Sequence, residues 1–209
     1  MKLIIIPAVI SRTQEELDTI LKKIGSSADL LQLDIMDGKF VPSTSLNFNF
    51  EIPQDRFSYE AHLMISDPET WIEKFGQKVK TIIVHLETVD NPGRFIQKIK
   101  KMGKKAALAL NPETPQEALR AYVNEIDQVL IMTVHPGFYG SKFLPEMAEK
   151  IKSLRELAPE LDIEVDGGIN PETIELVHSA GANMFVSGSY LIKAQNLKKN
   201  MEILKNKIS

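Results

Sequence analysis

The chain has 209 residues, of which 43% are hydrophobic and 25% charged, and it carries a formal net charge of −3 with no cysteine. The absence of cysteine excludes a disulfide scaffold, an iron–sulfur cluster and a thiolate zinc site. The longest apolar run, residues 3–10, is too short to cross a bilayer, which needs about 20 residues. No signal-peptide cleavage pattern follows that run, and the slightly acidic balance argues against a nucleic-acid surface. We therefore expect a cytoplasmic protein that binds neither nucleic acid nor membrane.

Eight short segments rich in β-branched and apolar residues recur along the chain. They are near-continuous rather than alternating, which is typical of strands buried on both faces. In chain order they cover residues 3–10, 30–35, 57–64, 81–86, 106–110, 129–134, 163–165 and 184–186.

Amphipathic stretches with recognisable starts lie between most of these segments. Thr13 and Glu16 form a capping-box pattern ahead of one predicted helix. In three further places a capping residue precedes a proline at the first helical position, namely Asp67-Pro68, Thr114-Pro115 and Asn170-Pro171. Glycines stand where helices should end, at Gly25, Gly76, Gly103 and Gly181. We expect helices in at least seven of the eight connections and a long loop over residues 41–53.

Strands that alternate with helices require a parallel sheet with right-handed connections. An open doubly wound sheet usually has a glycine-rich turn after its first strand, and residues 9–13 contain no glycine. A (β/α)8 barrel needs at least about 200 residues, which this chain just supplies. We therefore predict an α/β protein that forms one (β/α)8 TIM barrel domain over residues 1–209.

In such a barrel the active site is built at the carboxyl ends of the strands. Asp34, His62 and Asp166 lie near three of these ends, and Asp34 and His62 stand in apolar runs where an unpaired polar group is costly. Asp34 and Asp166 come from different sides of the barrel. They can therefore remove a proton from one face of a ligand carbon and return it on the other. The same three side chains can also form a site for a divalent metal ion.

Glycines follow the last two predicted strands, as Gly167 and Gly168 after one and Gly188 after the other. Glycine lets backbone N–H groups approach an anion closely. The loops after the last two strands are the usual phosphate site of barrel enzymes, so we predict a small phosphorylated substrate. Three methionines at strand ends are expected either in the core or as an apolar lid over the reaction centre: Met36, Met64 and Met132.

Several motifs occur in order over essentially the whole chain. They are LDIMDGKFVP at 33–42, AHLM at 61–64, VHPGF at 134–138 followed by Gly140, EVDGGI at 164–169 and SGS at 187–189. Together they closely resemble the ribulose-phosphate 3-epimerase family. The resemblance implies a barrel isomerase of the pentose phosphate pathway that interconverts D-ribulose 5-phosphate and D-xylulose 5-phosphate. It also implies one divalent metal cation (Zn, Mn, Mg or Fe) and a homo-oligomer.

The resemblance assigns roles to individual residues. Asp34 and Asp166 match the two acid/base aspartates of the family, and together with His62 they match three of its four metal ligands. The residues that match contacts to the substrate and its phosphate are His62, Gly137, Phe138, Tyr139, Gly140, Gly167, Gly168, Gly188 and Ser189. Those that match the methionines closing over the reacting carbons are Met36, Met64 and Met132.

Three departures from the family pattern fall at this site. Gln32 stands where the family has a histidine as fourth metal ligand, Ala8 replaces a serine that contacts substrate, and Tyr139 replaces a loop glycine. An amide oxygen can ligate Mg²⁺ or Mn²⁺, but it is a poorer partner than imidazole for Zn²⁺ or Fe²⁺.

Three interpretations stay open. The chain is an epimerase with a weakened or harder-metal site, a sugar-phosphate-binding barrel that has lost catalysis, or an epimerase for a related hexulose phosphate. The related decarboxylase and hexulose-phosphate synthase group is disfavoured, because its Asp-x-Lys-x-x-Asp signature is absent from the sequence.

Overall fold

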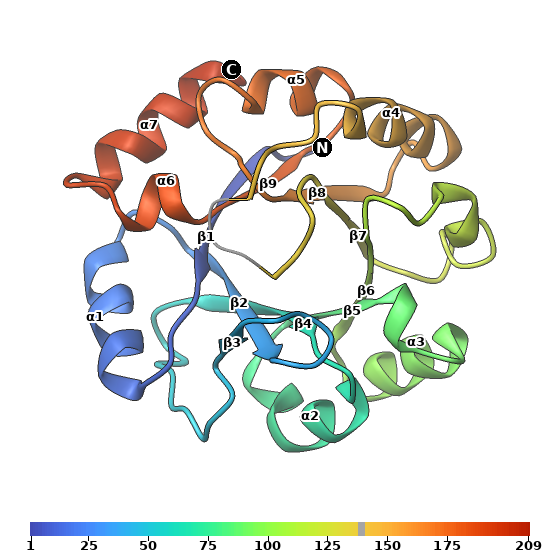
Figure 1. Cartoon of the computed structure of the whole chain (residues 1–209), viewed down its shortest axis with the longest axis horizontal. Coiled ribbons are helices and arrows are strands. Elements are labelled where there is room, and N and C mark those ends of the chain that lie inside the picture. Colours follow the sequence, from blue (N-terminus) through green and yellow to red (C-terminus); the bar gives the residue numbers. More distant parts are fainter. Residues whose placement is uncertain (138–140) are drawn as a thin grey trace.

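Eight parallel strands close into a barrel at the centre of the molecule (Figure 1). The computed structural model describes residues 1–137 and 141–209. Strand β1 pairs with both β9 and β2, and this double pairing closes the ring. The barrel strands are β1 Ile4–Val9, β2 Leu30–Asp37, β4 Ser58–Met64, β5 Thr81–His85, β6 Lys105–Leu110, β7 Gln128–Met132, β8 Asp162–Asp166 and β9 Met184–Ser187. The predicted (β/α)8 barrel is therefore confirmed.

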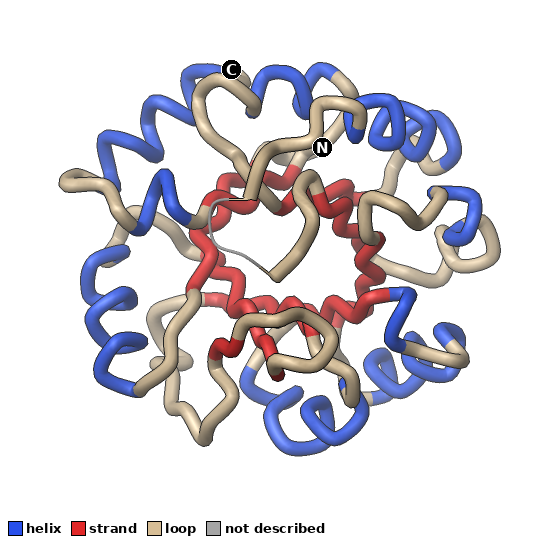
Figure 2. The backbone as a smooth tube through the Cα atoms, in the orientation of Figure 1, coloured by secondary structure: helices blue, strands red, loops and turns tan. Residues whose placement is uncertain are grey.

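Helices surround the strands on the outside of the ring (Figure 2). The α-helices are α1 Gln14–Ile24, α2 Pro68–Phe75, α3 Pro92–Lys101, α4 Met147–Leu157, α5 Ile174–Ser179, α6 Ser189–Ile192 and α7 Leu197–Lys207. Three short 3-10 helices are η1 Gly76–Lys78, η2 Leu86–Thr88 and η3 Gln116–Leu119.

The local capping signals explain where α1 and α2 begin. Thr13 and Asp67 each accept a hydrogen bond from the backbone N–H three residues later, which satisfies a donor that the helix itself leaves free. Helix α1 buries Leu17, Leu21 and Ile24, which recur on one face of the helix, against the barrel. The caps thus set where α1 and α2 begin, and the buried face of α1 packs on the outside of the barrel.

Two helix predictions were wrong. The pair Thr114-Pro115 precedes the 3-10 helix η3 and further turns rather than an α-helix in the fully described connection from β6 to β7. The backbone there combines 3-10 and α-helical hydrogen bonds, because the Leu119 carbonyl accepts from the N–H groups of both Tyr122 and Val123, three and four residues later. Helix α5 begins at Ile174 rather than Pro171, since the Asn170 side chain accepts from the Glu172 N–H and forms a turn first.

The expected long loop over residues 41–53 is confirmed, with one short addition. Strand β3, Thr44–Ser45, pairs antiparallel with the end of β2. The Ser11 N–H donates to Ser45 Oγ, and the Leu46 N–H donates to the Ser11 carbonyl. The loop after β2 is thus fastened beside the end of β1.

The strand register places polar side chains in two layers inside the barrel. Asp34 pairs in register with His62, and Gln32 with Glu60, between β2 and β4. Side chains two residues apart on a strand share one face, so Glu60 lies one layer below His62, and Glu164 one layer below Asp166.

Among the described residues, no helix has the length and apolar character needed to cross a membrane.

Candidate active site at the carboxyl ends of the strands

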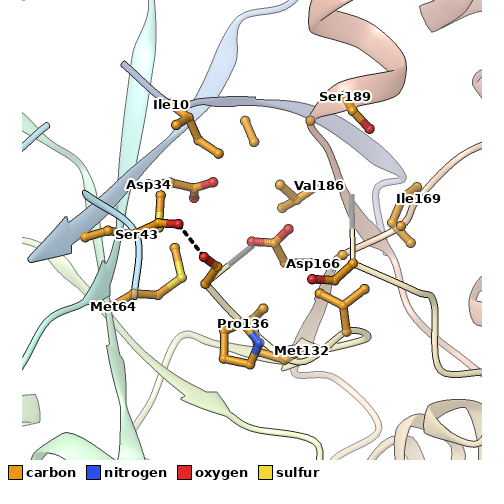
Figure 3. Close-up of a pocket in the computed structure, with 18 of the residues that line it drawn as sticks. Ile10, Asp34, Ser43, Met64, Met132, Pro136, Asp166, Ile169, Val186 and Ser189 are labelled. Carbon is orange, nitrogen blue, oxygen red and sulfur yellow. Dashed lines mark hydrogen bonds between the residues drawn. The ribbon is translucent and has the colours of Figure 1, made fainter. Parts of the chain in front are cut away.

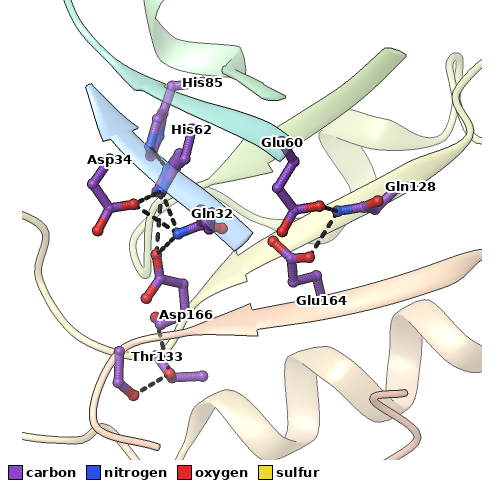
Figure 4. A network of polar contacts seen from close by, with 10 residues as sticks. Gln32, Asp34, Glu60, His62, His85, Gln128, Thr133, Glu164 and Asp166 are labelled. Carbon is purple, nitrogen blue, oxygen red and sulfur yellow. Dashed lines mark hydrogen bonds and ion pairs between the residues drawn. The ribbon is translucent and has the colours of Figure 1, made fainter. Parts of the chain in front are cut away.

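Asp34, His62 and Asp166 meet inside the barrel near the carboxyl ends of β2, β4 and β8 (Figure 4). His62 Nδ1 lies 3.2 Å from Asp166 Oδ2 and 3.6 Å from Asp34 Oδ1. One ligand atom from each residue lies within 4.8 Å of the others. The structure thus brings together three residues that the sequence places 28 to 132 positions apart, as counted from 34, 62 and 166.

The charges of Asp34, His62 and Asp166 favour the binding of a positive charge at this cluster. Burial, and then the negative charge of Asp166, raise the pKa of Asp34 to about 6. Burial alone lowers the pKa of His62, but hydrogen bonds and negative charges from Asp166 and Asp34 outweigh it and raise that pKa to about 9. Two carboxylates this close to an imidazole favour a proton or a metal cation between them.

A chain of hydrogen bonds runs from His62 to Glu87 on the side away from the aspartates. His62 Nε2 lies 2.8 Å from His85 Nε2, and His85 Nδ1 lies 3.3 Å from Glu87 Oε2. Burial lowers the pKa of His85 to about 4, so its ring is neutral and donates from one nitrogen only. Because the Glu87 carboxylate accepts the Nδ1 proton, His85 Nε2 accepts from His62. His62 Nδ1 is then the nitrogen that can release its proton and ligate a cation.

Gln32 lies fully buried between the two aspartates. Its Nε2 donates to Asp34 Oδ1 and to Asp166 Oδ2, each at 2.7 Å, and lies 3.5 Å from His62 Nδ1. Gln32 Oε1 is buried and has no hydrogen-bond partner in the described chain. The set of two carboxylates and one imidazole fits a divalent cation. In this orientation, however, the amide presents hydrogen-bond donors rather than a lone pair to the site.

A pocket opens above this cluster at the mouth of the barrel (Figure 3). Asp34 and Asp166 face it from opposite sides, while Gln32 and His62 are buried beneath. The predicted residues that line it are Met36, Met64, Met132, Gly137, Gly167, Gly168, Gly188 and Ser189. The other predicted loop residues, Phe138, Tyr139 and Gly140, lie outside the described residues.

The turn after β8 requires glycine. Gly167 has φ +120°, and a Cβ atom there would lie 2.5 Å from Cγ2 of Val134. Thr133 Oγ1 donates to the carbonyl oxygens of Asp166 and Gly167 at 3.0 and 2.6 Å. The backbone that follows Asp166 is therefore held close to β7, with its peptide groups at the pocket wall.

Sequence reasoning missed several residues that line the pocket. Arg12 follows β1, and Ser43 and Thr44 come from the loop after β2. Ser43 Oγ donates to the Gly137 carbonyl and so connects two loops across the mouth. No motif marks these residues, because they reach the pocket through loop conformation. Arg12 could have been identified as a charged residue that closely follows the end of the first predicted strand.

A second buried polar cluster lies one layer below and was also missed. Glu60, Gln128 and Glu164 are almost fully buried, and Gln128 Nε2 donates to Glu164 at 2.8 Å and lies 3.5 Å from Glu60 (Figure 4). Burial raises the pKa of Glu60 to about 7. Burial and the neighbouring Glu60 raise the pKa of Glu164 well above its usual range. Glu60 Oε1 and Glu164 Oε1 are buried without a hydrogen-bond partner in the described chain, so both carboxyl groups favour the protonated form.

Comparisons with known proteins agree with the geometry. The chain is 40% identical over 195 residues to the ribulose-phosphate 3-epimerase cytoplasmic isoform of Oryza sativa subsp. japonica, covering 86% of this chain and 86% of that protein. It is 37% identical over 203 residues to the ribulose-phosphate 3-epimerase of Bacillus subtilis, covering 92% and 94%. The solved structure of KGPDC from Streptococcus mutans aligns with a TM-score of 0.73 at 13% identity, covering 99% and 98% of the chains, and shows the shared fold alone.

The family model for the ribulose-phosphate 3 epimerase family matches residues 4–192. This range begins at β1 and extends through α6, so it contains all eight barrel strands. The family resemblance predicted from the sequence motifs is confirmed. The chain belongs to the ribulose-phosphate 3-epimerase family.

Proposed function

We propose that this protein interconverts D-ribulose 5-phosphate and D-xylulose 5-phosphate by moving the proton on C3 of the sugar between Asp34 and Asp166. The observation that carries the proposal is that these two carboxylates face one pocket from opposite sides. Epimerisation needs a proton removed from one face of a carbon and returned on the other. The similarity to the ribulose-phosphate 3-epimerases of Oryza sativa and Bacillus subtilis, at 40% and 37% identity, supports the same reaction.

Asp34 is suited to accept a proton near neutral pH. An ordinary aspartate has a pKa of about 3.9 and is a weak base toward a C–H bond. Burial and the charge of Asp166 raise the pKa of Asp34 to about 6, which strengthens it as a base while leaving it ionised at pH 7. Asp166 would donate the proton from the opposite face, and the roles reverse in the other direction.

Asp34, His62 and Asp166 would hold the divalent cation. When bound there, the cation supplies Lewis-acid polarisation of the ketone oxygen, worth several kcal/mol of charge stabilisation. The hydrogen bond of His62 to His85 orients the imidazole, so that Nδ1 points to the two aspartates. We propose that the cation is one of Zn, Mn, Mg and Fe. Metal analysis of the purified protein identifies which one.

The remaining pocket residues bind and enclose the substrate in this proposal. Backbone groups at Gly167, Gly168 and Gly188, with Ser189, would hold the phosphate. Met36, Met64 and Met132 line the pocket close to the aspartates and would keep water from the reacting carbon.

Proton exchange with solvent separates the roles of the two aspartates. The protein is incubated in D2O with each epimer separately, with added Mn²⁺, Mg²⁺ or Zn²⁺. We expect Asp34→Asn and Asp166→Asn each to lower interconversion by about 10²–10⁴-fold. Each variant should still exchange the C3 proton of one epimer, and the two variants should differ in which one. Asp90→Asn, an exposed aspartate, is the control. Absence of exchange in the unaltered protein with all three metals would contradict the proposal.

Two alternative functions each have an observation in their favour. The Gln32 amide already bridges the two aspartates, which favours a sugar-phosphate-binding barrel without catalysis. Substrate binding without turnover, with turnover restored by Gln32→His, would support that function. Ala8 lines the pocket where a serine is expected, which favours a larger hexulose phosphate. Comparing kcat/KM for pentulose and hexulose phosphates tests this second alternative.

We further propose that residues 1–209 form one domain and that the protein works in the cytoplasm as a homo-oligomer. Denaturant unfolding followed by two probes, fractionation of cells, and sedimentation at several concentrations test these three points.

A further inference from the structure

We propose that Gln32 is an internal substitute for the cation, and that it sets which cations this protein accepts. In the metal-free protein the amide nitrogen holds Asp34 and Asp166 together. A cation binds only when the amide turns over and presents Oε1. This inference rests on the proposed use of a divalent metal, and it concerns the residue at which this chain departs from its family.

The Gln32 amide uses both of its donors on the two aspartates. Gln32 Nε2 has two N–H groups, and it lies 2.7 Å from an oxygen of each aspartate. Both donors are therefore used on the two carboxylates that a cation would need. Oε1, at the other corner of the same amide, is buried with no partner in the described part of the chain. The two aspartates thus make the short hydrogen bonds that set the orientation of the amide, and His62 Nδ1 lies farther away, at 3.5 Å from Nε2.

Turning the amide over without a cation is unfavourable. The two corners of the amide are similar in size, so rotation causes no new steric contact. It would, however, set Oε1 against two carboxylate oxygens and leave the buried N–H groups without acceptors. With a cation between these oxygens, the same orientation becomes favourable. Gln32 and the cation therefore compete for Asp34 and Asp166, and cation binding should be weaker than with a histidine ligand.

The competition also changes the choice of cation. Once turned, Gln32 contributes an oxygen ligand, so the site has three oxygen ligands and one imidazole nitrogen. Oxygen ligands suit Mg²⁺ and Mn²⁺, whereas imidazole suits Zn²⁺. The protein should therefore discriminate less strongly in favour of Zn²⁺ over Mn²⁺ than its Gln32→His variant does.

Equilibrium dialysis and electron paramagnetic resonance measure cation binding without turnover. We expect Gln32→Glu, which has the same shape but no N–H donors, to bind Mn²⁺ at least about tenfold more tightly and to melt at a lower temperature when metal-free. Gln32→His should raise the ratio of Zn²⁺ to Mn²⁺ affinity at least about tenfold. In the unaltered protein, the side-chain amide signal of Gln32 in ¹⁵N spectra should shift when Mg²⁺ is added.

Gln128→Glu is the matched control, because Gln128 also lies buried between two acidic side chains one layer below. It should lower the melting temperature without changing Mn²⁺ affinity. If Gln32→Glu binds Mn²⁺ no more tightly and Gln32→His leaves the affinity ratio unchanged, the inference is wrong. If Gln32→Glu fails to fold, the affinity ratio of Gln32→His decides. Cation binding as expected without turnover would overturn the proposed function and leave this inference standing.

We also infer from a separate observation that Arg12 helps to recognise the anionic end of the substrate. Arg12 lines the same pocket as Gly188 and Ser189. It follows β1, the neighbour of β9, and these two strands pair in register up to Pro7 and Ser187. Its backbone N–H donates to Glu16 Oε2 at 2.7 Å, which fixes the base of the side chain. In the described residues the exposed guanidinium forms no ion pair with a carboxylate.

An arginine so placed should act on binding rather than on the proton transfer. We expect Arg12→Ala to raise the KM for the pentulose phosphate and the inhibition constant of inorganic phosphate about tenfold or more, with kcat within about twofold. Turnover of the unphosphorylated pentulose should not change. Arg120→Ala, exposed in the connection between β6 and β7, is the control. A loss of kcat with unchanged KM, or unchanged phosphate inhibition, would overturn the inference. Phosphate binding measured directly by calorimetry tests it even without turnover.

Discussion

The position of the proton on His62 depends, through His85, on Glu87, which contacts neither aspartate in the described structure. Glu87 Oε1 accepts from the Asn111 N–H at 2.9 Å and from the Thr114 hydroxyl, and Oε2 faces His85. Burial on its own raises the pKa of Glu87, but these hydrogen bonds outweigh it and lower the pKa to about 2. Glu87 is thus ionised near neutral pH and accepts hydrogen bonds at both oxygens.

The variant Glu87→Gln should reverse this chain of hydrogen bonds. The Asn111 N–H is a fixed donor, so the new amide would turn its oxygen to Asn111 and its nitrogen to His85 Nδ1. His85 would then donate to His62 Nε2, which leaves the proton on His62 Nδ1 and blocks that ligand. We expect Mn²⁺ affinity and kcat/KM to fall about 10–100-fold, as measured by dialysis and steady-state kinetics. Thr114→Val, which keeps the carboxylate, should leave Mn²⁺ affinity unchanged.

Single residues differ in how far the sequence could predict them. Asp34 and His62 could be identified because each interrupts an apolar strand, where burial without a partner is costly. Gln32 could be identified only as a departure from the family pattern. The orientation of its amide depends on Asp166, which lies 134 residues away in sequence. No local pattern contains that information.

Among the elements, those with strong local signals were predicted best. The starts of α1 and α2 follow from side-chain caps within three residues of the helix, which are properties of the local sequence. The connection from β6 to β7 has a similar signal at Thr114 and Pro115, yet it forms η3 and turns. Its Thr114 hydroxyl donates to Glu87 instead of capping a helix. A distant partner thus overrides the local preference.

The turn between β8 and α5 allows a direct test of backbone conformation. Gly167→Ala would place a Cβ atom 2.5 Å from Val134 Cγ2 at φ +120°. We expect a loss of stability of about 1–3 kcal/mol and a KM for the sugar phosphate raised by about tenfold or more. Urea unfolding and steady-state kinetics measure these effects. At Gly93 in α3 an added Cβ would meet nothing closer than Asn91 Oδ1, at 3.7 Å, so Gly93→Ala should be neutral or slightly stabilising. Equal effects of both variants would contradict the assignment.

Strands β4 and β8 carry the buried acid pair Glu60 and Glu164, which makes stability depend on pH. The pKa of each is raised in the folded state, and that of Glu60 reaches about 7. Below the unfolded pKa of about 4.3 both states hold these protons, so folding pays no penalty. As the pH rises toward 7 the unfolded chain releases protons that the folded chain retains, and stability falls.

Glu164→Gln should therefore gain stability relative to the unaltered protein between pH 5 and pH 8. Because the neutral amide removes the group whose proton the folded state retains, we expect a relative gain of about 1–3 kcal/mol. Denaturant unfolding at both pH values measures it. Glu117→Gln, at an exposed position in η3, should run parallel to the unaltered protein. A parallel profile for Glu164→Gln as well would show that the pair is ionised in the folded state.

For the whole molecule, the alternation of strands and helices predicted a parallel sheet, because parallel strands need crossover connections, and the glycine-free turn at residues 9–13 and the chain length favoured a barrel over an open sheet. The closure of the ring could not be located in the same way. β1 and β2 register through Ala8 with Gln32 and Val9 with Leu33, whereas β2 and β4 register from Leu30 to Met36. How far two strands overlap depends on the tilt of all strands in the ring, which is a property of the complete barrel.

β1 and β2 pair over only two residues each, so we expect the proposed cation to stabilise the whole barrel at this junction. Asp34 on β2 and Asp166 on β8 lie on either side of the pair β1 and β9, so a cation held by both would bridge this part of the ring from within. At a concentration 100-fold above its dissociation constant, a ligand of the folded state adds about 2.7 kcal/mol of stability. For a chain of this size that corresponds to a rise in Tm of roughly 5–10 °C.

We expect saturating Mn²⁺ to produce this rise in calorimetry and to slow hydrogen exchange in peptides covering β1 and β2 more than in peptides covering β5 and β6. The larger effect follows because β5 and β6 contribute none of the three ligands and register from Thr81 to His85 without a comparable interruption. Asp34→Asn should lose both effects, since it removes the ligand on β2. If Mn²⁺ stabilises Asp34→Asn as much as the unaltered protein, the cation binds elsewhere. If exchange slows equally in all strands, the cation stabilises the fold without acting on the junction of β1 and β2.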